Sequence, residues 1–366
     1  MQLVDAPVGV HSAWPLRDPA AWSGVIAPMV RAIESVCEPE LLEVPPVGDA
    51  LVDRARARLS PRTVLPSHSR ATAQRRSAAL GRVLAASPTR ALVSLASSTD
   101  LVLDPGRPTV QVTDATFDAV SALYPLYADL SASSRRQGRW VERRAALHTH
   151  HYLVASVWAR DSLVGDIGVP PFRVTVAPFG PAITPKGPRP PRAPGDVLRL
   201  LLVARDWERK NGAAALRVLS LLRHLRPVEL TIVGDAPAEL PPGARAVGPL
   251  DAAQLSRLYA HSDLLLEPSR ANASGVVITD ALTHGLPVLA VDAGGVSTLV
   301  RHGVGGWLVD PGQVEGQMLA RLVRLSPQRL AQVSASAAED AARRLSWKAW
   351  AQQLAAVTLP GAGAAT

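Results

Sequence analysis

The sequence contains little of several residue types, and each shortage excludes a class of protein. Cys37 is the only cysteine among 366 residues, so an intrachain disulfide cannot form and a reducing compartment fits. No apolar run approaches the roughly 20 residues of a membrane-spanning helix. The first residues also lack the basic segment and long apolar stretch of a signal peptide. We therefore expect a cytoplasmic protein.

Lysine and aromatic residues are scarce as well. Lysine occurs only at Lys186, Lys210 and Lys348, so almost all of the positive charge is arginine, and the net charge is +8. A basic chain of this kind favours no particular partner by charge alone. Nucleic acid is not expected, because the sequence has no nucleic-acid motif and few aromatic side chains to stack on bases.

What is present indicates a globular α/β protein. The chain is 47% hydrophobic and 19% charged, and its length suits two domains. Apolar strand-like runs alternate with helical patterns, beginning with a strand over Leu3 to Val10 and a helix over Val25 to Val36. Residues 181–196 are rich in proline, which predicts a stiff linker between a first domain, 1–180, and a second domain, 197–343.

The most informative stretch is 263–295. It predicts a buried strand at Leu264 to Leu266, a polar loop at Pro268 to Ser274, a helix at Val276 to Thr283 and a strand at Pro287 to Val291. A loop of small residues therefore leads into a helix N-terminus. Such a terminus binds anions, because its free N–H groups and the helix dipole both point outward.

This stretch resembles the signature of family 4 retaining glycosyltransferases of the GT-B fold. The family's prolines, glycines and alanine fall on Pro268-Ser269, Gly275, Ala281 and Gly285-Leu286-Pro287-Val288. Its two glutamates fall on Asn272 and Asp280, so the spacing is kept while neither residue is Glu. Arg205 and Lys210 are similar to the family's Arg and Lys after the first strand of the second domain.

The resemblance implies an architecture and a set of roles. The fold would be GT-B, with two facing Rossmann-like doubly wound domains, a helix over 344–358 that crosses back to the first domain, and a loose tail at 359–366. Arg205 and Lys210 would hold the diphosphate of a nucleotide-sugar donor, and Gly24 would approach it from the first domain. The remaining donor-binding positions would be Val247 at the nucleobase, Ser274, Gly275 and Val276 at the helix N-terminus, and Asp280 at the ribose.

Two further residues are candidates for the reaction centre. Asn272 would lie near the sugar hydroxyls, where the family uses a carboxylate. Asp114 follows the predicted strand Thr109 to Thr113 and would be either a polar group near the reaction centre or the N-cap of the next helix. No D-x-D motif is present, and His148, His150 and His151 have no Cys or carboxylate partner, so neither a metal nor a cofactor is expected.

The implied function is retaining transfer of a sugar to an acceptor hydroxyl of a glycan, glycolipid or natural product, which the sequence does not identify further. One alternative is a weak or inactive relative that binds nucleotide or sugar as a partner protein. Another is a GT-B phosphorylase or epimerase. The arginine-rich segment 50–91 is interpreted as a pair of solvated helices or as a peripheral contact with an anionic membrane at its inner face.

Overall fold

The computed structural model describes residues 2–96, 98–187, 189–190 and 197–358. The chain divides into two compact units. The N-terminal unit comprises Met1–Pro178 and Trp347–Thr366, and the C-terminal unit comprises Phe179–Ser346. The described residues do not include 188 and 191–196 of the proposed linker, or any of the proposed tail, 359–366. The domain boundaries that the sequence suggests therefore stay predictions.

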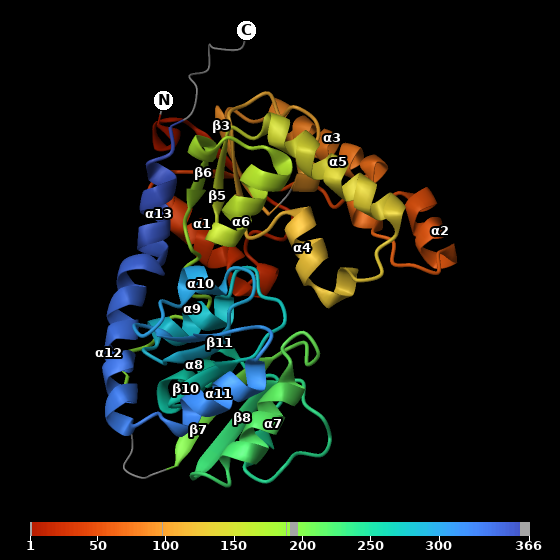
Figure 1. Cartoon of the computed structure of the whole chain (residues 1–366). Coiled ribbons are helices and arrows are strands. Elements are labelled where there is room, and N and C mark those ends of the chain that lie inside the picture. Colours follow the sequence, from red (N-terminus) through yellow and green to blue (C-terminus); the bar gives the residue numbers. More distant parts are fainter. Residues whose placement is uncertain (1, 97, 188, 191–196, 359–366) are drawn as a thin grey trace. The chain divides into compact units, whose positions relative to one another are not determined.

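The N-terminal unit is built on a parallel sheet of six strands in the order β2-β1-β3-β4-β5-β6 (Figure 1). Its strands are β1 Val8–Ser12, β2 Glu40–Leu41, β3 Ala91–Leu95, β4 Thr109–Thr113, β5 His151–Val154 and β6 Val174–Val176. Its helices are α1 Ile26–Glu34, α2 Leu51–Leu59, α3 Arg70–Ala85, α4 Phe117–Leu123, α5 Ala132–His148, α6 Val157–Ser162 and α13 Trp347–Ala355.

The C-terminal unit has a second parallel sheet of six strands, in the order β12-β11-β10-β7-β8-β9. Its strands are β7 Leu198–Ala204, β8 Val228–Gly234, β9 Ala244–Ala246, β10 Leu264–Glu267, β11 Val288–Val291 and β12 Gly306–Val309. Its helices are α7 Gly212–Leu222, α8 Ala252–His261, α9 Val276–Thr283, α10 Val296–Leu299, α11 Val314–Val323 and α12 Pro327–Arg344.

The strands of the C-terminal unit are apolar on both faces because helices cover both faces. Along β7, Leu198, Leu200 and Leu202 enter one hydrophobic core with α7 and α11. The alternate residues Leu201 and Val203 enter a second core with α9 and the later part of α12. Successive side chains of a strand point to opposite faces, so a strand buried on both sides reads as a continuous apolar run. This is why the strand was recognisable in the sequence.

The last helix of the chain belongs to the N-terminal unit. Helix α13 packs against α1, and Trp350 is fully buried there (Figure 1). The backbone N–H of Leu3 also donates to the carbonyl of Val357. Two doubly wound α/β units with a C-terminal helix on the first are the architecture that the resemblance implied, so this prediction of the fold is confirmed.

The predicted start of the first strand is wrong. The predicted strand over Leu3 to Val10 is a 3-10 turn at Leu3–Asp5 followed by β1, which begins only at Val8. Pro7 separates the two, and proline has no N–H to give to a sheet. The turn packs against α13, and Leu3 is buried there.

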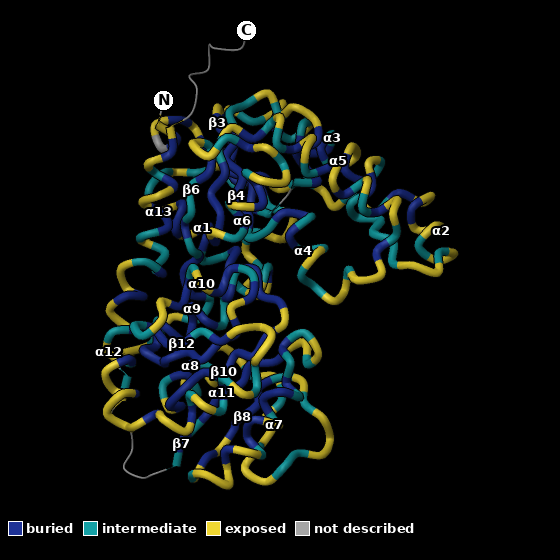
Figure 2. The backbone as a smooth tube through the Cα atoms, in the orientation of Figure 1, coloured by how far each residue is buried: buried dark blue, intermediate teal, exposed yellow. Residues whose placement is uncertain are grey.

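The surface of the N-terminal unit is uneven in polarity. Helix α2 lies largely exposed, whereas the strands β3 and β4 are buried (Figure 2). None of the helices that the structure describes is both long and apolar enough to cross a membrane.

Candidate active site

The candidate residues of the C-terminal unit gather at one point of its sheet. Strands β7 and β10 are neighbours, yet the chain leaves β7 toward β8 and β9 and leaves β10 toward β11 and β12. The loops that follow these two strands diverge at their carboxyl ends, and such a switch point is where open α/β sheets bind ligands. The loops are tied together, since the Arg270 N–H donates to the Arg209 carbonyl at 2.9 Å. The first loop carries Arg205 and Lys210, and the second carries Asn272, Ser274 and Gly275.

Lys210 has a partner that the sequence analysis missed. Its Nζ lies 2.6 Å from Oε1 of Glu267, and the two residues are only 5% and 0% exposed. The ammonium charge assigned to a diphosphate is therefore compensated from within the unit. Glu267 ends the apolar run of β10 directly before Pro268, and a lone carboxylate in that position was the available signal.

Glu267 is the centre of a buried polar cluster. Its Oε1 also accepts hydrogen bonds from Ser269 Oγ and, at 3.2 Å, from Asn272 Nδ2. The Asn272 Oδ1 in turn accepts from the Gly275 N–H at 2.9 Å. Glu267 Oε2 is buried and has no hydrogen-bond partner in the part of the chain that the structure describes. Asn272 thus uses both ends of its amide, one toward the carboxylate and one toward helix α9.

Helix α9 opens with a glycine for two reasons. Gly275 has a φ of 61°, which side-chain-bearing residues rarely adopt, and a Cβ there would lie 2.3 Å from Leu299. Its own N–H is bonded to Asn272, so it is not available to a phosphate in this arrangement. The next N–H groups, of Val276 and Val277, belong to the first helical turn and have no partner within the helix. These groups and the half-buried Ser274 are the part of the α9 N-terminus that is predicted to bind an anion.

Asp280 is engaged by the backbone of its own unit. The N–H groups of Ile183, at 3.0 Å, and of Ala182 donate to its carboxylate. Burial away from water raises the pKa of Asp280 to about 7, against the opposing effect of these two hydrogen bonds. The carboxylate proposed to bind a ribose therefore holds the segment that leads into the C-terminal unit, and its role toward a ribose stays a prediction.

Arg205 and Val247 are the accessible members of the predicted set. The Arg205 guanidinium is exposed and makes no hydrogen bond or ion pair with the residues that the structure describes. Val247 is partly exposed in the loop after β9, next to Gly248, whose carbonyl accepts from the Gly234 N–H at 2.8 Å. Arg205 is thus a cation without an internal counter-charge at the end of β7.

Gly24 and Asp114 belong to the N-terminal unit. Gly24 is the third of three consecutive residues with positive φ, after Trp22 and Ser23. Asp114 follows β4 at its carboxyl end and is half-buried. It is not the N-cap of the next helix, because Thr116 takes that place and its side chain accepts from the Ala119 N–H at 3.2 Å. Of the two roles considered for Asp114, the helix cap is wrong, and the role near a reaction centre stays a prediction.

Comparison with known proteins agrees with this geometry. Residues 198–327 match the family model of glycosyl transferases group 1. Over 218 residues the chain is 33% identical to D-inositol 3-phosphate glycosyltransferase of Thermobispora bispora, which covers 51% of this chain and 50% of that protein. It is 29% identical over 140 residues to the sulfoquinovosyl transferase SQD2 of Arabidopsis thaliana, covering 36% and 28%. The chain therefore spans half or less of the length of these curated relatives.

Solved structures share the fold of the whole chain. HepE of Anabaena, solved in complex with UDP and glucose, superposes with a TM-score of 0.64 over 95% of this chain and 98% of that one, at 17% identity. Sucrose-phosphate synthase of Thermosynechococcus elongatus gives a TM-score of 0.65 at 15% identity, covering 95% and 97%. Residues 198–327, which include the switch-point loops, are therefore similar to glycosyl transferases group 1, and the chain as a whole has the GT-B fold.

Proposed function

We propose that the protein is a retaining glycosyltransferase that moves a sugar from a nucleotide-sugar donor to an acceptor hydroxyl. The observation that carries the proposal is the pairing of an exposed, uncompensated Arg205 with the open N-terminus of α9 at one switch point, inside the segment that matches the family. A relative of this fold was solved with UDP and glucose, which supports a uridine diphosphate sugar as the donor.

The chemistry follows from what these groups can stabilise. Transfer breaks the bond between the anomeric carbon and a phosphate oxygen and forms a bond from the same carbon to the acceptor oxygen. For retention the new bond forms on the same face, and the acceptor proton passes to an oxygen of the leaving phosphate. The diphosphate gains negative charge as it leaves, and a fixed guanidinium with helix N–H groups stabilises that charge.

Lys210 has a different part in this proposal. The Glu267 carboxylate neutralises the Lys210 charge. Lys210 therefore fixes the loop that carries Arg205 and does not bind the phosphates directly. No residue of the proposed machinery needs a metal, and we expect transfer to continue in the presence of a chelator.

The test is release of UDP from UDP-sugars with acceptor extracts, in wild type and Arg205→Ala. Loss of a group that stabilises developing charge should lower kcat/KM by about 100-fold. The matched control is Arg223→Ala, which also removes an exposed arginine, at the C-terminal end of α7, away from the carboxyl ends of the strands. Equal loss in both variants, or none in Arg205→Ala, would contradict the assignment of Arg205.

A second function has its own support. Asn272 and Asp280 replace the family's glutamates, and both are held by internal hydrogen bonds. A relative that binds a nucleotide sugar without turning it over would tolerate that arrangement. Calorimetric binding of UDP-sugar without release of UDP, in the presence of acceptor extracts, would favour this partner-protein function over the enzyme.

We also propose a peripheral contact between helix α2 and anionic lipid. The helix exposes Arg54, Arg56 and Arg58 together with Leu51 and Leu59, and Leu59 is 85% exposed. Basic helices with exposed apolar side chains lie at the membrane interface, where both kinds of residue are favourable.

A further inference from the structure

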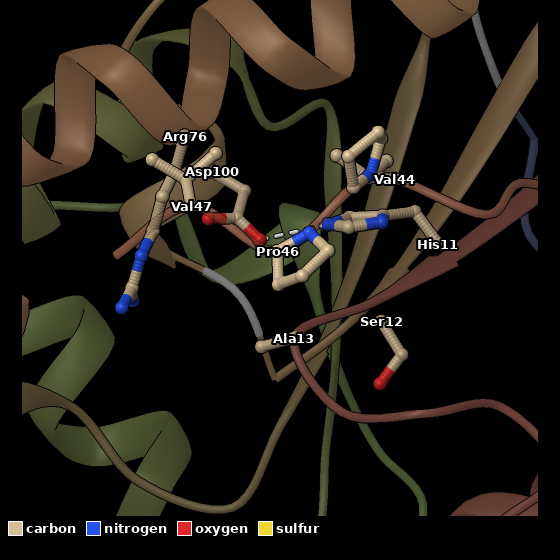
Figure 3. Close-up of a pocket in the computed structure, with 9 residues that line it drawn as sticks. His11, Ser12, Ala13, Val44, Pro46, Val47, Arg76 and Asp100 are labelled. Atoms are coloured by element: carbon tan, nitrogen blue, oxygen red, sulfur yellow. Dashed lines mark hydrogen bonds and ion pairs between the residues drawn. The ribbon is translucent and has the colours of Figure 1, made fainter. Parts of the chain in front are cut away.

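The N-terminal unit has a switch point of its own, and a cavity lies there. Strand β1 lies between β2 and β3, so the chain leaves β1 on one side and returns on the other. A cavity of about 200 Å³ lies at the carboxyl end of β1 (Figure 3). It is lined by His11 and Ser12 of β1, by residues 44–47 after β2, by Arg76 of α3 and by Asp100. None of these residues has a role in the donor-binding half of the proposed reaction.

Asp100 is a carboxylate held in one orientation. His11 Nε2 donates to its Oδ2 at 2.7 Å, and Thr99 Oγ1 donates to its Oδ1 at 3.1 Å. The dashed line in Figure 3 marks the first of these bonds. The other ring nitrogen of His11, Nδ1, takes no part in this bond. It is buried without a hydrogen-bond partner among the described residues. Buried polar atoms are normally satisfied, so His11 has hydrogen-bonding capacity that the described residues do not use.

The one arginine of the cavity lining already has an acidic partner. Arg76 pairs with Asp49 at 3.3 Å, and both side chains remain partly accessible. A phosphate would meet the Asp100 carboxylate without an uncompensated cation to hold it, in contrast to Arg205 in the other unit. A neutral polyol suits the set better, because each hydroxyl can donate to a carboxylate and accept from a guanidinium. The remaining walls, Val44, Pro45, Pro46 and Val47, offer apolar contact to the C–H groups of a ring.

A pair of stacked aromatic rings begins at the residue that follows the cavity lining in sequence. Trp14 follows the cavity residues Ser12 and Ala13, and it stacks on Trp22 with ring centres 5.7 Å apart and planes only 6° from parallel. Three consecutive left-handed residues, Trp22 to Gly24, make the turn that places Trp22 there. Stacking fixes the Trp14 ring while 39% of the residue stays exposed. A sugar or cyclitol ring presents an apolar C–H face, which suits the aromatic plane of Trp14, and a hydroxyl edge, which suits the polar cavity.

We propose that this cavity with Trp14 binds one neutral six-membered polyol ring, a pyranose or a cyclitol, through Asp100 and Arg76. On the proposed function, on which this assignment rests, the ring belongs to the acceptor. The volume limits the ligand to about one ring, since sites for drug-sized ligands measure roughly 300–1,000 Å³. Asp100 is the hydroxyl acceptor, and His11 is a positioning residue that holds its carboxylate.

The test is a ligand-observed NMR titration of the full chain with methyl α-D-glucopyranoside, with myo-inositol and with inorganic phosphate. We expect saturable binding of at least one of the two rings and none of phosphate. Asp100→Ala should raise the Kd of the ring that binds by about tenfold or more, as for the loss of a hydrogen bond to a charged group. Trp14→Ala should raise it several-fold, and this exposed position leaves folding intact if the buried Asp100 variant does not fold.

The control is Phe172→Ala. Phe172 is an aromatic residue that is 82% exposed and precedes β6, so it lies at the amino edge of the same sheet, and its variant should bind like wild type. Wild type that releases UDP from UDP-sugars but binds neither ring, or Trp14→Ala that binds as tightly as wild type, overturns the cavity assignment alone. Ring binding without UDP release overturns the proposed function and leaves the cavity assignment standing. Preferential binding of phosphate would overturn the neutral class and indicate a phosphorylated ligand.

Discussion

At the scale of single residues, the C-terminal unit has its carboxylate at position 267 rather than at position 272. The family pattern places Glu where this chain has Asn272, and this chain has a buried Glu267 whose Oε1 lies 3.2 Å from the Asn272 amide. An amide is the side chain that can donate to Glu267 and accept from the Gly275 N–H at the same time. The departure from the family pattern at 272 is therefore coupled to the residue at 267.

This coupling predicts a compensating pair of substitutions. Asn272→Asp keeps the acceptor for Gly275 but turns a second carboxylate oxygen toward Glu267, so we expect the free energy of unfolding to fall by about 1–3 kcal/mol. Asn272→Asp with Glu267→Gln should recover only the part of the loss that comes from repulsion between the two carboxylates, because Glu267→Gln also removes the anionic partner of Lys210. Urea denaturation of the two single variants and the double variant measures the interaction. Additive losses would show that the two positions are independent.

Lys210 predicts a large effect on stability as well as on catalysis. Lys210→Ala leaves the Glu267 carboxylate buried without its cation, and removal of one partner of a buried ion pair costs about 3–5 kcal/mol. Denaturation of the C-terminal unit measures this cost, with Lys186→Ala as the control at an exposed lysine of the same unit. A Lys210→Ala variant that is as stable as the control but has lost donor binding would return Lys210 to the role first inferred from the sequence.

At the scale of elements, α9 is fixed at both ends of the site. Its N-terminus is set by Gly275 against Leu299, and Asp280 on its second turn holds the N–H groups of Ala182 and Ile183. Tyr259 and His284 also face this region. Burial, and secondly the nearby Asp280, raises the pKa of Tyr259, and the Asp280 carbonyl bonds to the His284 ring at 2.7 Å. The helix that opens the anion site thus also anchors the segment entering the unit.

Asp280 predicts a pH dependence of stability. Burial raises its pKa from 3.8 to about 7, so between these values the folded chain binds a proton that the unfolded chain does not. Stability contributed by this group is therefore present at low pH and is lost as the pH rises toward 7, by up to about 1.4 kcal/mol per pH unit. Asp280→Asn removes the titration, so the difference in unfolding free energy between wild type and variant should shift in favour of the variant from pH 5 to pH 8. Asp292→Asn, an exposed aspartate of the same unit, should show no such shift.

The helices and strands also show which parts of the structure could be predicted from the sequence. The unit 263–295 was predicted closely, with β10, α9 and β11 at Leu264–Glu267, Val276–Thr283 and Val288–Val291, because apolar runs, a glycine and a proline mark each boundary. The Lys210–Glu267 pair was missed because its partners are 57 positions apart, and nothing local says which cation a buried carboxylate will meet. The cavity of the N-terminal unit was missed for the same reason, since its walls come from four separate segments.

At the scale of the whole molecule, charge is distributed very unequally along the chain. Residues 50–91 contain nine arginines against Asp53, a net charge of 9 − 1 = +8, which equals the +8 of the entire chain. All other residues together are neutral. The charge excess therefore belongs to one part of the N-terminal unit, where α2 exposes Arg54, Arg56 and Arg58.

This distribution predicts binding to anionic vesicles that depends on one helix. Each arginine near an anionic surface contributes about 1 kcal/mol, so replacing Arg54, Arg56 and Arg58 by Gln should lower binding to phosphatidylglycerol vesicles by about 100-fold. The control replaces three exposed arginines of the C-terminal unit, Arg223, Arg257 and Arg324, and lowers the net charge by the same amount. Sedimentation with vesicles at low and high salt measures both, because screening weakens such contacts. Equal losses in the two triple variants would mean that net charge alone attracts the protein, and no sedimentation of wild type at low salt would exclude the contact.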